Sequence, residues 1–303
     1  MDGDDAKVSV FDAGFQHGVG LFETMVAKNG VVFKAIEHMS RLAESAAMLR
    51  LTENLKVEPL VEALCLILKE NDQESARVRL TVTGGDLNML QRTGNSSGGD
   101  PTIVIQTQPP TEYPPSFFEN GVIVSIASGR VNPYEFGAGH KTLHYWPSLL
   151  NLQLAAMQQC GESLLLTQSA LVAGGCVSNI FVVNGGTLFT PVARGEEDAQ
   201  DEPSAVLPGI TRSTIIQLAD GLEIGTSRKS LTLDDVLAAD EVFLTNSSWG
   251  VLPVVGLLAS VLDEGNPTEQ AHSIGENSVG PVSNQLALAY KDLLEQETRG
   301  VSV

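Results

Sequence analysis

The prolines near residue 110 constrain the fold of this chain more than any other feature. Four of the seven residues in Pro109-Pro110-Thr111-Glu112-Tyr113-Pro114-Pro115 are prolines. Because proline lacks an amide donor and fixes its own φ angle, such a segment interrupts helices and central strands and acts as a semi-rigid linker. We therefore expect an interdomain linker at residues 109–118, between a smaller domain of residues 1–108 and a larger domain of residues 119–303.

Both parts of the chain mix strands with helices, which predicts an α+β fold. In the first part we expect strands at residues 8–12, 77–83 and 102–108, a hairpin over residues 22–33 with its turn at Asn29-Gly30, and helices at residues 36–49 and 59–69. In the second part we expect strands at residues 122–126, 164–166, 180–183 and 188–190, and helices at residues 147–159, 211–222, 233–238 and 282–296. Residues 92–100 read as a polar loop tip, and residues 196–202 as a solvated acidic loop.

The balance of charges excludes some classes of partner. The chain has 18 Lys and Arg against 37 Asp and Glu, a net charge of −19, whereas nucleic acids and anionic membranes require a basic surface. We therefore expect neither as a partner. The three cysteines and five histidines show no metal-ligand spacing, so we expect no metal site. The acidic N-terminus is unlike a secretory signal, and no apolar run approaches the length of a membrane span, so we expect a soluble cytoplasmic protein.

A candidate site is centred on Lys141. Leu143, Tyr145 and Trp146 follow closely and can desolvate the amine, which lowers its pKa and makes it nucleophilic. Later turns supply amide and hydroxyl donors that suit a phosphate dianion, at residues 178–181, 207–212 and 245–248. A nucleophilic lysine combined with phosphate-binding turns is what pyridoxal phosphate requires.

Several motifs of the chain follow one another in a fixed order, at residues 8–12, 20–24, 37–42, 140–143, 178–181, 207–212 and 241–246. In the order and separation of these segments, over residues 8 to 255, the sequence resembles the class IV aminotransferases, the fold-type IV pyridoxal phosphate enzymes. The family includes branched-chain and D-amino acid transaminases and 4-amino-4-deoxychorismate lyase.

The resemblance implies a two-domain architecture, with a smaller N-terminal α/β domain and a larger C-terminal, β-barrel-like domain that carries helices. It implies that Lys141 forms the Schiff base with pyridoxal 5′-phosphate and that Arg41 binds the cofactor phosphate. Backbone amides and hydroxyls would complete the phosphate site, from Ile210, Thr211, Ser247 and Ser248. The substrate would be a small molecule, either an amino acid or an aminodeoxychorismate-like compound, and the protein would be a homodimer.

Three positions depart from the family pattern. Gly174 stands where family members commonly have the glutamate that pairs with the pyridine nitrogen of the cofactor, and Gly84 stands where many have an arginine. Val19 replaces the aspartate of the usual Gly-Asp-Gly motif. Without the carboxylate at position 174 the cofactor is a poorer electron sink. Arg79 or Arg92 are candidates to replace the arginine missing at Gly84.

The sequence leaves three functions open. Residues 20–25 and 245–254 are more similar to 4-amino-4-deoxychorismate lyases, whereas His140-Lys141-Thr142-Leu143 is equally similar to transaminases. We therefore favour the lyase, which eliminates pyruvate, over a branched-chain or D-amino acid transaminase. A catalytically degenerate binding protein is the third candidate, because of Gly174 and Gly84.

Overall fold

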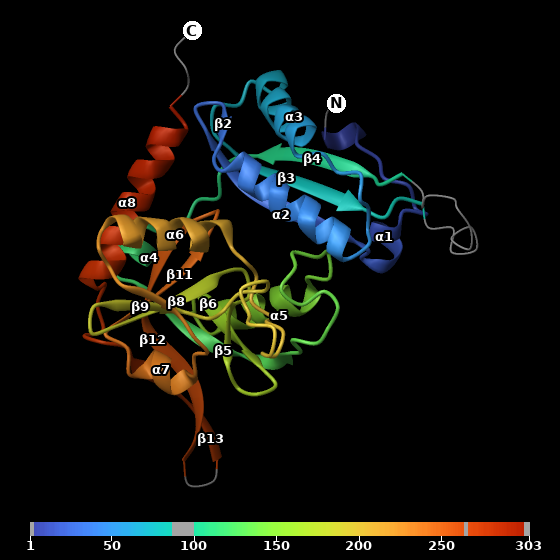
Figure 1. Cartoon of the computed structure of the whole chain (residues 1–303). Coiled ribbons are helices and arrows are strands. Elements are labelled where there is room, and N and C mark those ends of the chain that lie inside the picture. Colours follow the sequence, from blue (N-terminus) through green and yellow to red (C-terminus); the bar gives the residue numbers. More distant parts are fainter. Residues whose placement is uncertain (1–2, 87–99, 264–265, 300–303) are drawn as a thin grey trace. The chain divides into compact units, whose positions relative to one another are not determined.

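The chain forms two compact units in the computed structural model, which describes residues 3–86, 100–263 and 266–299 (Figure 1). Unit 1 comprises Met1–Thr111, His140–Tyr145 and Leu294–Val303, and unit 2 comprises Glu112–Gly139 and Trp146–Leu293. The segment that contains Lys141 therefore belongs to unit 1, although it lies beyond the proline-rich segment in the sequence. The domain limits proposed from the sequence stay a prediction, as does the loop tip at residues 92–100, most of which lies outside the described residues.

Unit 1 contains a four-stranded antiparallel sheet in the order β2-β1-β3-β4. Its strands are β1 (Gly20–Lys28), β2 (Val31–Val32), β3 (Ala76–Thr83) and β4 (Ile103–Gln108). Asn29 and Gly30 join β1 to β2 with φ angles of 51° and 73°. This is the left-handed geometry that a two-residue hairpin turn needs, and the hairpin predicted from Asn29-Gly30 is confirmed.

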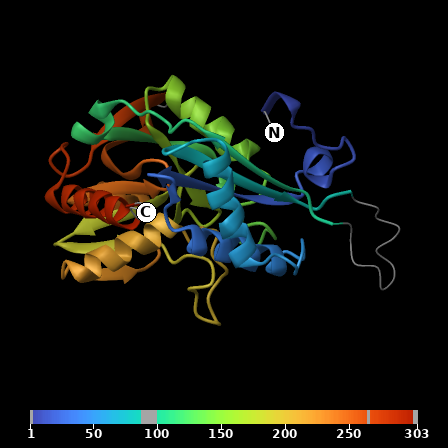
Figure 2. The same cartoon turned by 90° about the horizontal axis from the view of Figure 1, so that it is seen from above.

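Two helices pack on one face of this sheet, as Figures 1 and 2 show. They are α2 (Ala35–Met48) and α3 (Val57–Glu70). Met39 and Leu42 of α2 and Leu64 of α3 are buried against Leu80 and other apolar residues of the strands. Helical spacing of apolar residues predicted both helices to within a few residues, because burial of one apolar stripe per helix forms this core.

The expected strand at residues 8–12 is wrong. Val8, Val10 and Phe11 are exposed, and the segment, which follows a short 3-10 turn at Gly3–Asp5, leads into helix α1 (Ala13–His17). Asp12 is the N-cap of α1, because its carboxylate accepts hydrogen bonds from the amides of Gly14 and Phe15. The alternation of apolar residues over positions 8–12 suggested a strand, but Asp12 instead caps the start of helix α1.

Unit 2 is built on a curled sheet of nine strands in the order β10-β9-β8-β11-β12-β5-β6-β7, with β13 paired to β12. Three pairings, β5 with β6, β5 with β12 and β9 with β10, are parallel, and the others are antiparallel. The strands are β5 (Val122–Val131), β6 (Glu162–Thr167), β7 (Val172–Gly175), β8 (Asn179–Asn184), β9 (Thr187–Thr190), β10 (Thr226–Arg228), β11 (Glu241–Asn246), β12 (Gly250–Asp263) and β13 (Asn266–Ser273).

Five helices accompany this sheet in the described residues, and all but the first of them were predicted from the sequence. They are α4 (Pro115–Glu119), α5 (Trp146–Met157), α6 (Ile210–Gly221), α7 (Leu233–Leu237) and α8 (Pro281–Glu297). The main core of unit 2 contains Leu164, Ile180, Leu244 and Leu252 from neighbouring strands. The mixed α+β fold predicted from the sequence is confirmed.

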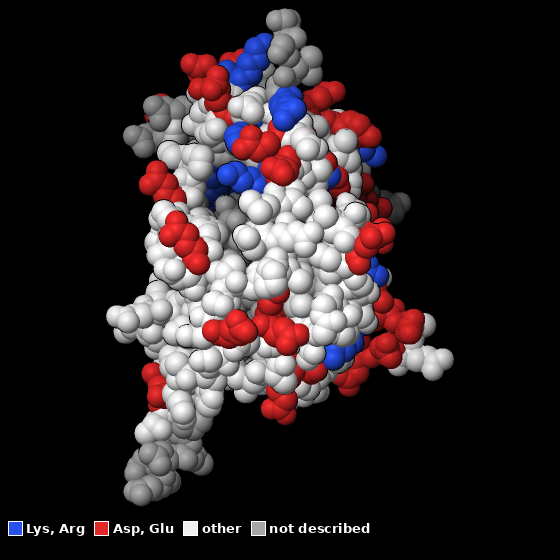
Figure 3. Space-filling view, turned by 90° about the vertical axis from the view of Figure 1, so that its left-hand side faces the viewer, with Lys and Arg blue, Asp and Glu red and all other residues white. Residues whose placement is uncertain are grey.

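Many of the Asp and Glu side chains lie on the surface of the protein (Figure 3). Figure 3 shows acidic side chains spread over one face of the molecule, with fewer basic ones among them. No helix in the described parts of the chain is long and apolar enough to span a membrane. Across the same residues, no cluster of three or more His, Cys, Asp or Glu side chains is placed to hold a metal ion.

Candidate active site

Lys141 lies on a segment that runs beside strand β1. Leu21 and Thr142 form a β-bridge, the Phe22 amide donates to the Lys141 carbonyl at 3.0 Å, and the Leu143 amide donates to the Gly20 carbonyl at 2.9 Å. A Cβ atom at Gly20 would lie 2.5 Å from the Val82 carbonyl oxygen and 2.7 Å from Cδ1 of Leu143. The glycine at position 20 therefore allows the close approach that fixes the backbone of Lys141.

The Lys141 amine is surrounded by aromatic rings. Its Nζ lies 4.5 Å from the centroid of the Phe22 ring and 5.3 Å from that of Tyr145, and the two rings meet edge to face. Burial lowers the pKa of Lys141 to about 8, the cation of Arg41 adds to this shift, and the charge of Glu23 partly offsets it. A substantial fraction of the amine is therefore neutral near physiological pH, as a nucleophile requires.

Glu23 organises the charges next to Lys141. Both of its carboxylate oxygens bind Arg41, with Nε to Oε1 at 2.9 Å and Nη2 to Oε2 at 2.6 Å, and Nδ1 of His38 lies 2.8 Å from Oε2. Burial alone would raise the pKa of Glu23, but Arg41 and His38 more than offset it and lower that pKa to about 2. The fork between Arg41 and Glu23 fixes the guanidinium. The role of Arg41 as a phosphate ligand stays a prediction.

Arg79 is a second cation beside the Lys141 amine. Its guanidinium carbon lies 3.8 Å from the centroid of the same Phe22 ring, and its Nε donates to the Thr81 hydroxyl at 3.3 Å. Among the described residues, no carboxylate forms an ion pair with Arg79. Burial lowers the pKa of Arg79, and neighbouring Arg77 adds to the shift. A half-buried cation in this position favours an anionic ligand. Arg92, the other candidate, lies outside the described residues.

In unit 2, the predicted phosphate ligands Ile210 and Thr211 form the first turn of α6. The N-cap residue is Gly209, and no side chain caps the helix, so its first amides remain available to a bound anion. The side chain of Asn179 holds the approach to the helix, because its Nδ2 donates to the Leu207 carbonyl at 2.9 Å. A Cβ atom at Gly209 would lie only 1.9 Å from the Asn179 Oδ1, which requires glycine there.

Ser247 and Ser248 lie in a turn after strand β11. The Asn246 Oδ1 accepts from the amides of Ser248 at 2.8 Å and Trp249 at 3.0 Å, which is an Asx-type turn. Thr245, at the end of β11, pairs with Asn179 of β8. The turn of Ser247 and Ser248 therefore begins beside Asn179, the residue that also binds the segment before α6. The Thr245 hydroxyl is buried and has no hydrogen-bond partner among the described residues. These donors fit a phosphate group, although the assignment of the individual ligands stays a prediction.

Gly174 has a backbone that excludes the glutamate expected from the family pattern. Its φ angle is 126°, and a Cβ atom there would lie 2.8 Å from the Ser178 carbonyl oxygen. An L-residue is strained at such an angle. The backbone conformation at position 174 therefore requires glycine, and a Gly174→Glu substitution alone would be strained.

The sequence analysis missed Glu162, the fully buried carboxylate beside this turn. Its Oε1 accepts from the amides of Ser163 at 3.0 Å and Cys176 at 3.2 Å. Its Oε2 accepts from the Val177 amide at 3.3 Å and the Ser178 hydroxyl at 3.1 Å. Burial raises the pKa of Glu162 to about 7, against the effect of these donors. An acidic residue two positions before the apolar run 164–166 was the available signal.

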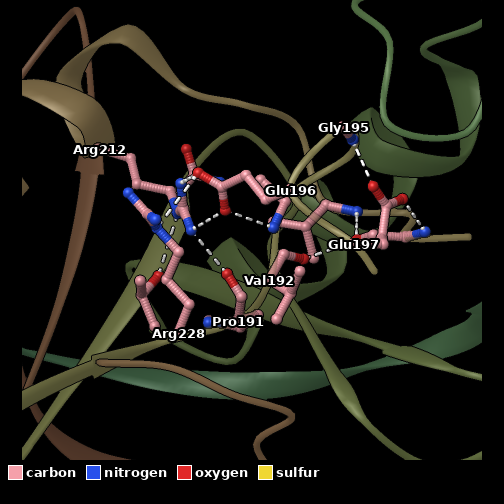
Figure 4. Close-up of polar contacts among 12 residues, drawn as sticks. Pro191, Val192, Gly195, Glu196, Glu197, Arg212 and Arg228 are labelled. Atoms are coloured by element: carbon pink, nitrogen blue, oxygen red, sulfur yellow. Dashed lines mark hydrogen bonds and ion pairs between the residues drawn. The ribbon is translucent and has the colours of Figure 1, made fainter. Parts of the chain in front are cut away.

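Residues 196–202 form an exposed loop, as the sequence predicted, but its first two residues have specific partners that the sequence did not indicate. Arg212, which is fully buried, donates to both carboxylate oxygens of Glu196, at 2.9 and 2.7 Å, and to the Pro191 carbonyl at 2.8 Å (Figure 4). Glu197 accepts from the amides of Gly195 and Ser204. Burial of the guanidinium requires a charged partner, and that partner orders the loop directly before α6.

Comparison with known proteins identifies the family. The sequence model for amino-transferase class IV matches residues 20–257. The chain belongs to the class IV aminotransferase family. It is 33% identical over 296 residues to the putative branched-chain-amino-acid aminotransferase of Methanocaldococcus jannaschii, which covers 97% of this chain and 93% of that protein. It is 30% identical over 261 residues to the aminodeoxychorismate lyase of Bacillus subtilis, with coverages of 84% and 82%.

Solved structures of the family share the fold. The branched-chain amino acid aminotransferase of Escherichia coli superposes with a TM-score of 0.82 at 28% identity, covering 100% of this chain and 94% of that one. The fold-type IV architecture expected from the sequence is thus confirmed. As a class IV aminotransferase, the chain is an enzyme that depends on pyridoxal phosphate.

Proposed function

We propose that this class IV aminotransferase uses Lys141 to bind pyridoxal phosphate covalently and then to move protons at the substrate α-carbon. The amine over the Phe22 and Tyr145 rings, with its pKa lowered to about 8, carries this proposal. The cofactor supplies an electron sink for the negative charge that develops at the α-carbon. Lys141 supplies the base and acid that take up and return the proton.

The remaining predicted residues hold the cofactor phosphate in this proposal. Ile210 and Thr211 offer the amides of the uncapped α6 N-terminus, and Thr211 also offers its hydroxyl. Ser247 and Ser248 offer donor groups from the turn after β11, which the Asn246 side chain holds in place. Arg41, held by Glu23, supplies a permanent cation for the dianion.

We further propose that Arg79 binds a carboxylate of the substrate, in place of the arginine that Gly84 lacks. Its guanidinium and the Lys141 amine contact the same Phe22 ring, so an anion bound by Arg79 lies near the amine. The Arg79→Gln variant is expected to raise the KM for a substrate with that carboxylate by about ten- to a hundredfold, as loss of a charged hydrogen-bond pair does. Substrate binding measured for Arg77→Gln is the matched control, because Arg77 binds Gln108 instead.

Transamination of an amino acid is the leading reaction, and elimination of pyruvate from 4-amino-4-deoxychorismate is the second candidate. Transamination is supported by the similarity to the putative branched-chain-amino-acid aminotransferase, which is 33% identical and matches 97% of the chain. The aminodeoxychorismate lyase is 30% identical and matches 84% of the chain. The lyase-like residues 245–254, which include the β11 turn, support the second candidate. This ordering reverses the preference from the sequence motifs alone.

A homodimer is supported by an apolar stripe on α5. Trp146, Leu149, Leu150, Leu154 and Met157 recur at helical spacing and are all exposed, Trp146 at 71% and Met157 at 81%. A contiguous apolar patch of this kind is typical of a protein interface. We propose that a second copy of this chain covers it. A cytoplasmic location stays a prediction.

The proposed activity is tested with purified protein loaded with pyridoxal phosphate. Leucine, alanine and glutamate are offered with 2-oxoglutarate or pyruvate as acceptor, and 4-amino-4-deoxychorismate is offered alone. Amino transfer that is lost in Lys141→Ala supports the leading reaction, whereas pyruvate release without an acceptor supports the lyase. A protein that takes up no cofactor would instead be a degenerate member of the family.

A further inference from the structure

Glu162 is a fully buried carboxylate of unit 2 that the proposed mechanism does not use. Its side chain is 0% exposed, and its carboxylate lies against the glycine pair that precedes β8. A Cβ atom at Gly175 would lie 2.8 Å from the Glu162 Cγ and 2.2 Å from the Ser178 Oγ. The close contact shows that the turn at residues 174–178 is built around this carboxylate.

The carboxylate fixes the turn through four donors. The amides of Ser163, Cys176 and Val177 and the hydroxyl of Ser178 all bind it. Three of these donors come from residues 176–178, and the Cys176 amide also donates to the Ser163 carbonyl at 3.1 Å. A buried carboxylate with such a donor set is costly to disturb, because the Val177 amide and the Ser178 hydroxyl would lose it as their partner.

Asn246 connects this turn to the turn that carries Ser247 and Ser248. Its Nδ2 donates to the Val177 carbonyl at 3.3 Å, while its Oδ1 accepts from the amides of Ser248 and Trp249. The amide of Val177 therefore donates to Glu162, and the carbonyl of Val177 accepts from Asn246. The orientation of the Asn246 amide depends on both contacts.

We propose that Glu162 is a positioning residue for the cofactor phosphate, acting through residues 176–178 and Asn246 on the turn of Ser247 and Ser248. The inference rests on the proposed binding of the phosphate by that turn. Glu162 does not touch the cofactor. Side chains alternate along β6, so Glu162 shares the face of Leu164, whereas Leu165, which pairs with Gly174, lies on the opposite face. Glu162 thus does not replace the carboxylate that position 174 lacks.

The test compares Glu162→Gln with Glu241→Gln. Glu241 is a buried carboxylate of the same sheet that binds the amides of Val282 and Ser283 at the start of α8, at the other end of β11 from Asn246. Both variants disturb a buried carboxylate with several donors, so both are expected to lower stability. Only Glu162→Gln is expected to alter the phosphate site.

The readouts are the Kd for pyridoxal phosphate, the Kd for 4-deoxypyridoxine 5′-phosphate, which lacks the aldehyde, and the 31P chemical shift of each bound phosphate. We expect Glu162→Gln to raise both Kd values by about ten- to a hundredfold, the range that applies to residues that orient metal ligands. The 31P shift is expected to move in the same variant. Glu241→Gln is expected to keep the wild-type Kd values and shift.

Ser178→Ala provides a milder variant if Glu162→Gln does not fold. It removes one donor to the Glu162 Oε2 and is expected to raise both Kd values severalfold, with a 31P shift in the same direction. Wild-type affinity and an unchanged 31P shift in the folded Glu162 or Ser178 variant would overturn the inference and leave the proposed function intact. Failure of the wild-type protein to bind either compound would instead contradict the proposed function.

Discussion

Glu23 carries the charge that keeps Arg41 in place and moderates the pKa of Lys141. Its own pKa is about 2 in the folded protein, below the usual 4.5, because Arg41 and His38 offset its burial. A carboxylate whose pKa is lowered by folding stabilises the protein above its unfolded pKa and loses that contribution as pH falls. The charged pair is therefore intact at neutral pH.

The Glu23→Gln variant tests this arrangement. At neutral pH we expect a loss of about 3–5 kcal/mol in the free energy of unfolding, because Arg41 keeps a buried charge without its partner. The gap between variant and wild type is expected to narrow as pH falls from about 4.5 towards about 2. Urea unfolding over a series of pH values measures the gap, and a gap independent of pH would contradict the ion pair.

Glu162 is expected to show the opposite dependence on pH. Folding raises its pKa from 4.5 to about 7, mainly through burial, so its contribution is present below the unfolded pKa and is lost as pH rises through about 7. The stability of the wild type relative to Glu162→Gln is therefore expected to fall between about pH 4.5 and pH 7. Urea unfolding of both proteins measures this trend, and a rise over that interval would contradict the raised pKa.

At the scale of elements, the close pairing of β1 with the Lys141 segment depends on Gly20. In Gly20→Ala the added methyl would meet the Val82 carbonyl and the Leu143 side chain, so we expect a loss of about 1–3 kcal/mol in stability. We also expect weaker attachment of the cofactor. Gly129→Ala is the control, because nothing lies within 4 Å of a Cβ there. Equal unfolding midpoints for the two variants would contradict the role of Gly20.

Elements with a strong local signal could be predicted from the sequence. The β1–β2 hairpin followed from Asn29-Gly30, and α2 followed from its apolar spacing. Strand β7 was missed because Val172-Ala173-Gly174-Gly175 carries two glycines, which are weak strand formers. Strand β13 was also missed, because its residues are mostly polar and show no apolar alternation.

The candidate site was predictable only in part, for a similar reason. Lys141 and the start of α6 are marked by local motifs. Glu162 and Arg79 acquire their surroundings from strands distant in the sequence, and those contacts have no local pattern. The ion pair of Glu196 with Arg212 likewise joins residues 16 positions apart, and the sequence placed only Glu196 in a solvated loop.

For the whole molecule, the apolar stripe of α5 predicts the state of association. We expect the wild type to sediment at twice the 32.2 kDa mass of one chain. A double variant, Leu150→Glu with Leu154→Glu, is expected to sediment as a monomer, because charges in an apolar interface are costly to bury. Leu66→Glu on α3, a leucine that is also exposed, at 57%, is expected to leave the dimer intact. A wild-type monomer would contradict the proposal.

The attachment of the cofactor to Lys141 is the central claim, and borohydride reduction followed by peptide mass spectrometry tests it most directly. The purified protein is incubated with pyridoxal phosphate, reduced, digested and mapped. The added mass is expected on the peptide that contains Lys141, and the rate of attachment is expected to rise as pH passes through about 8. Attachment at another lysine, or an unmodified Lys141 peptide from protein that has bound the cofactor, would contradict the account.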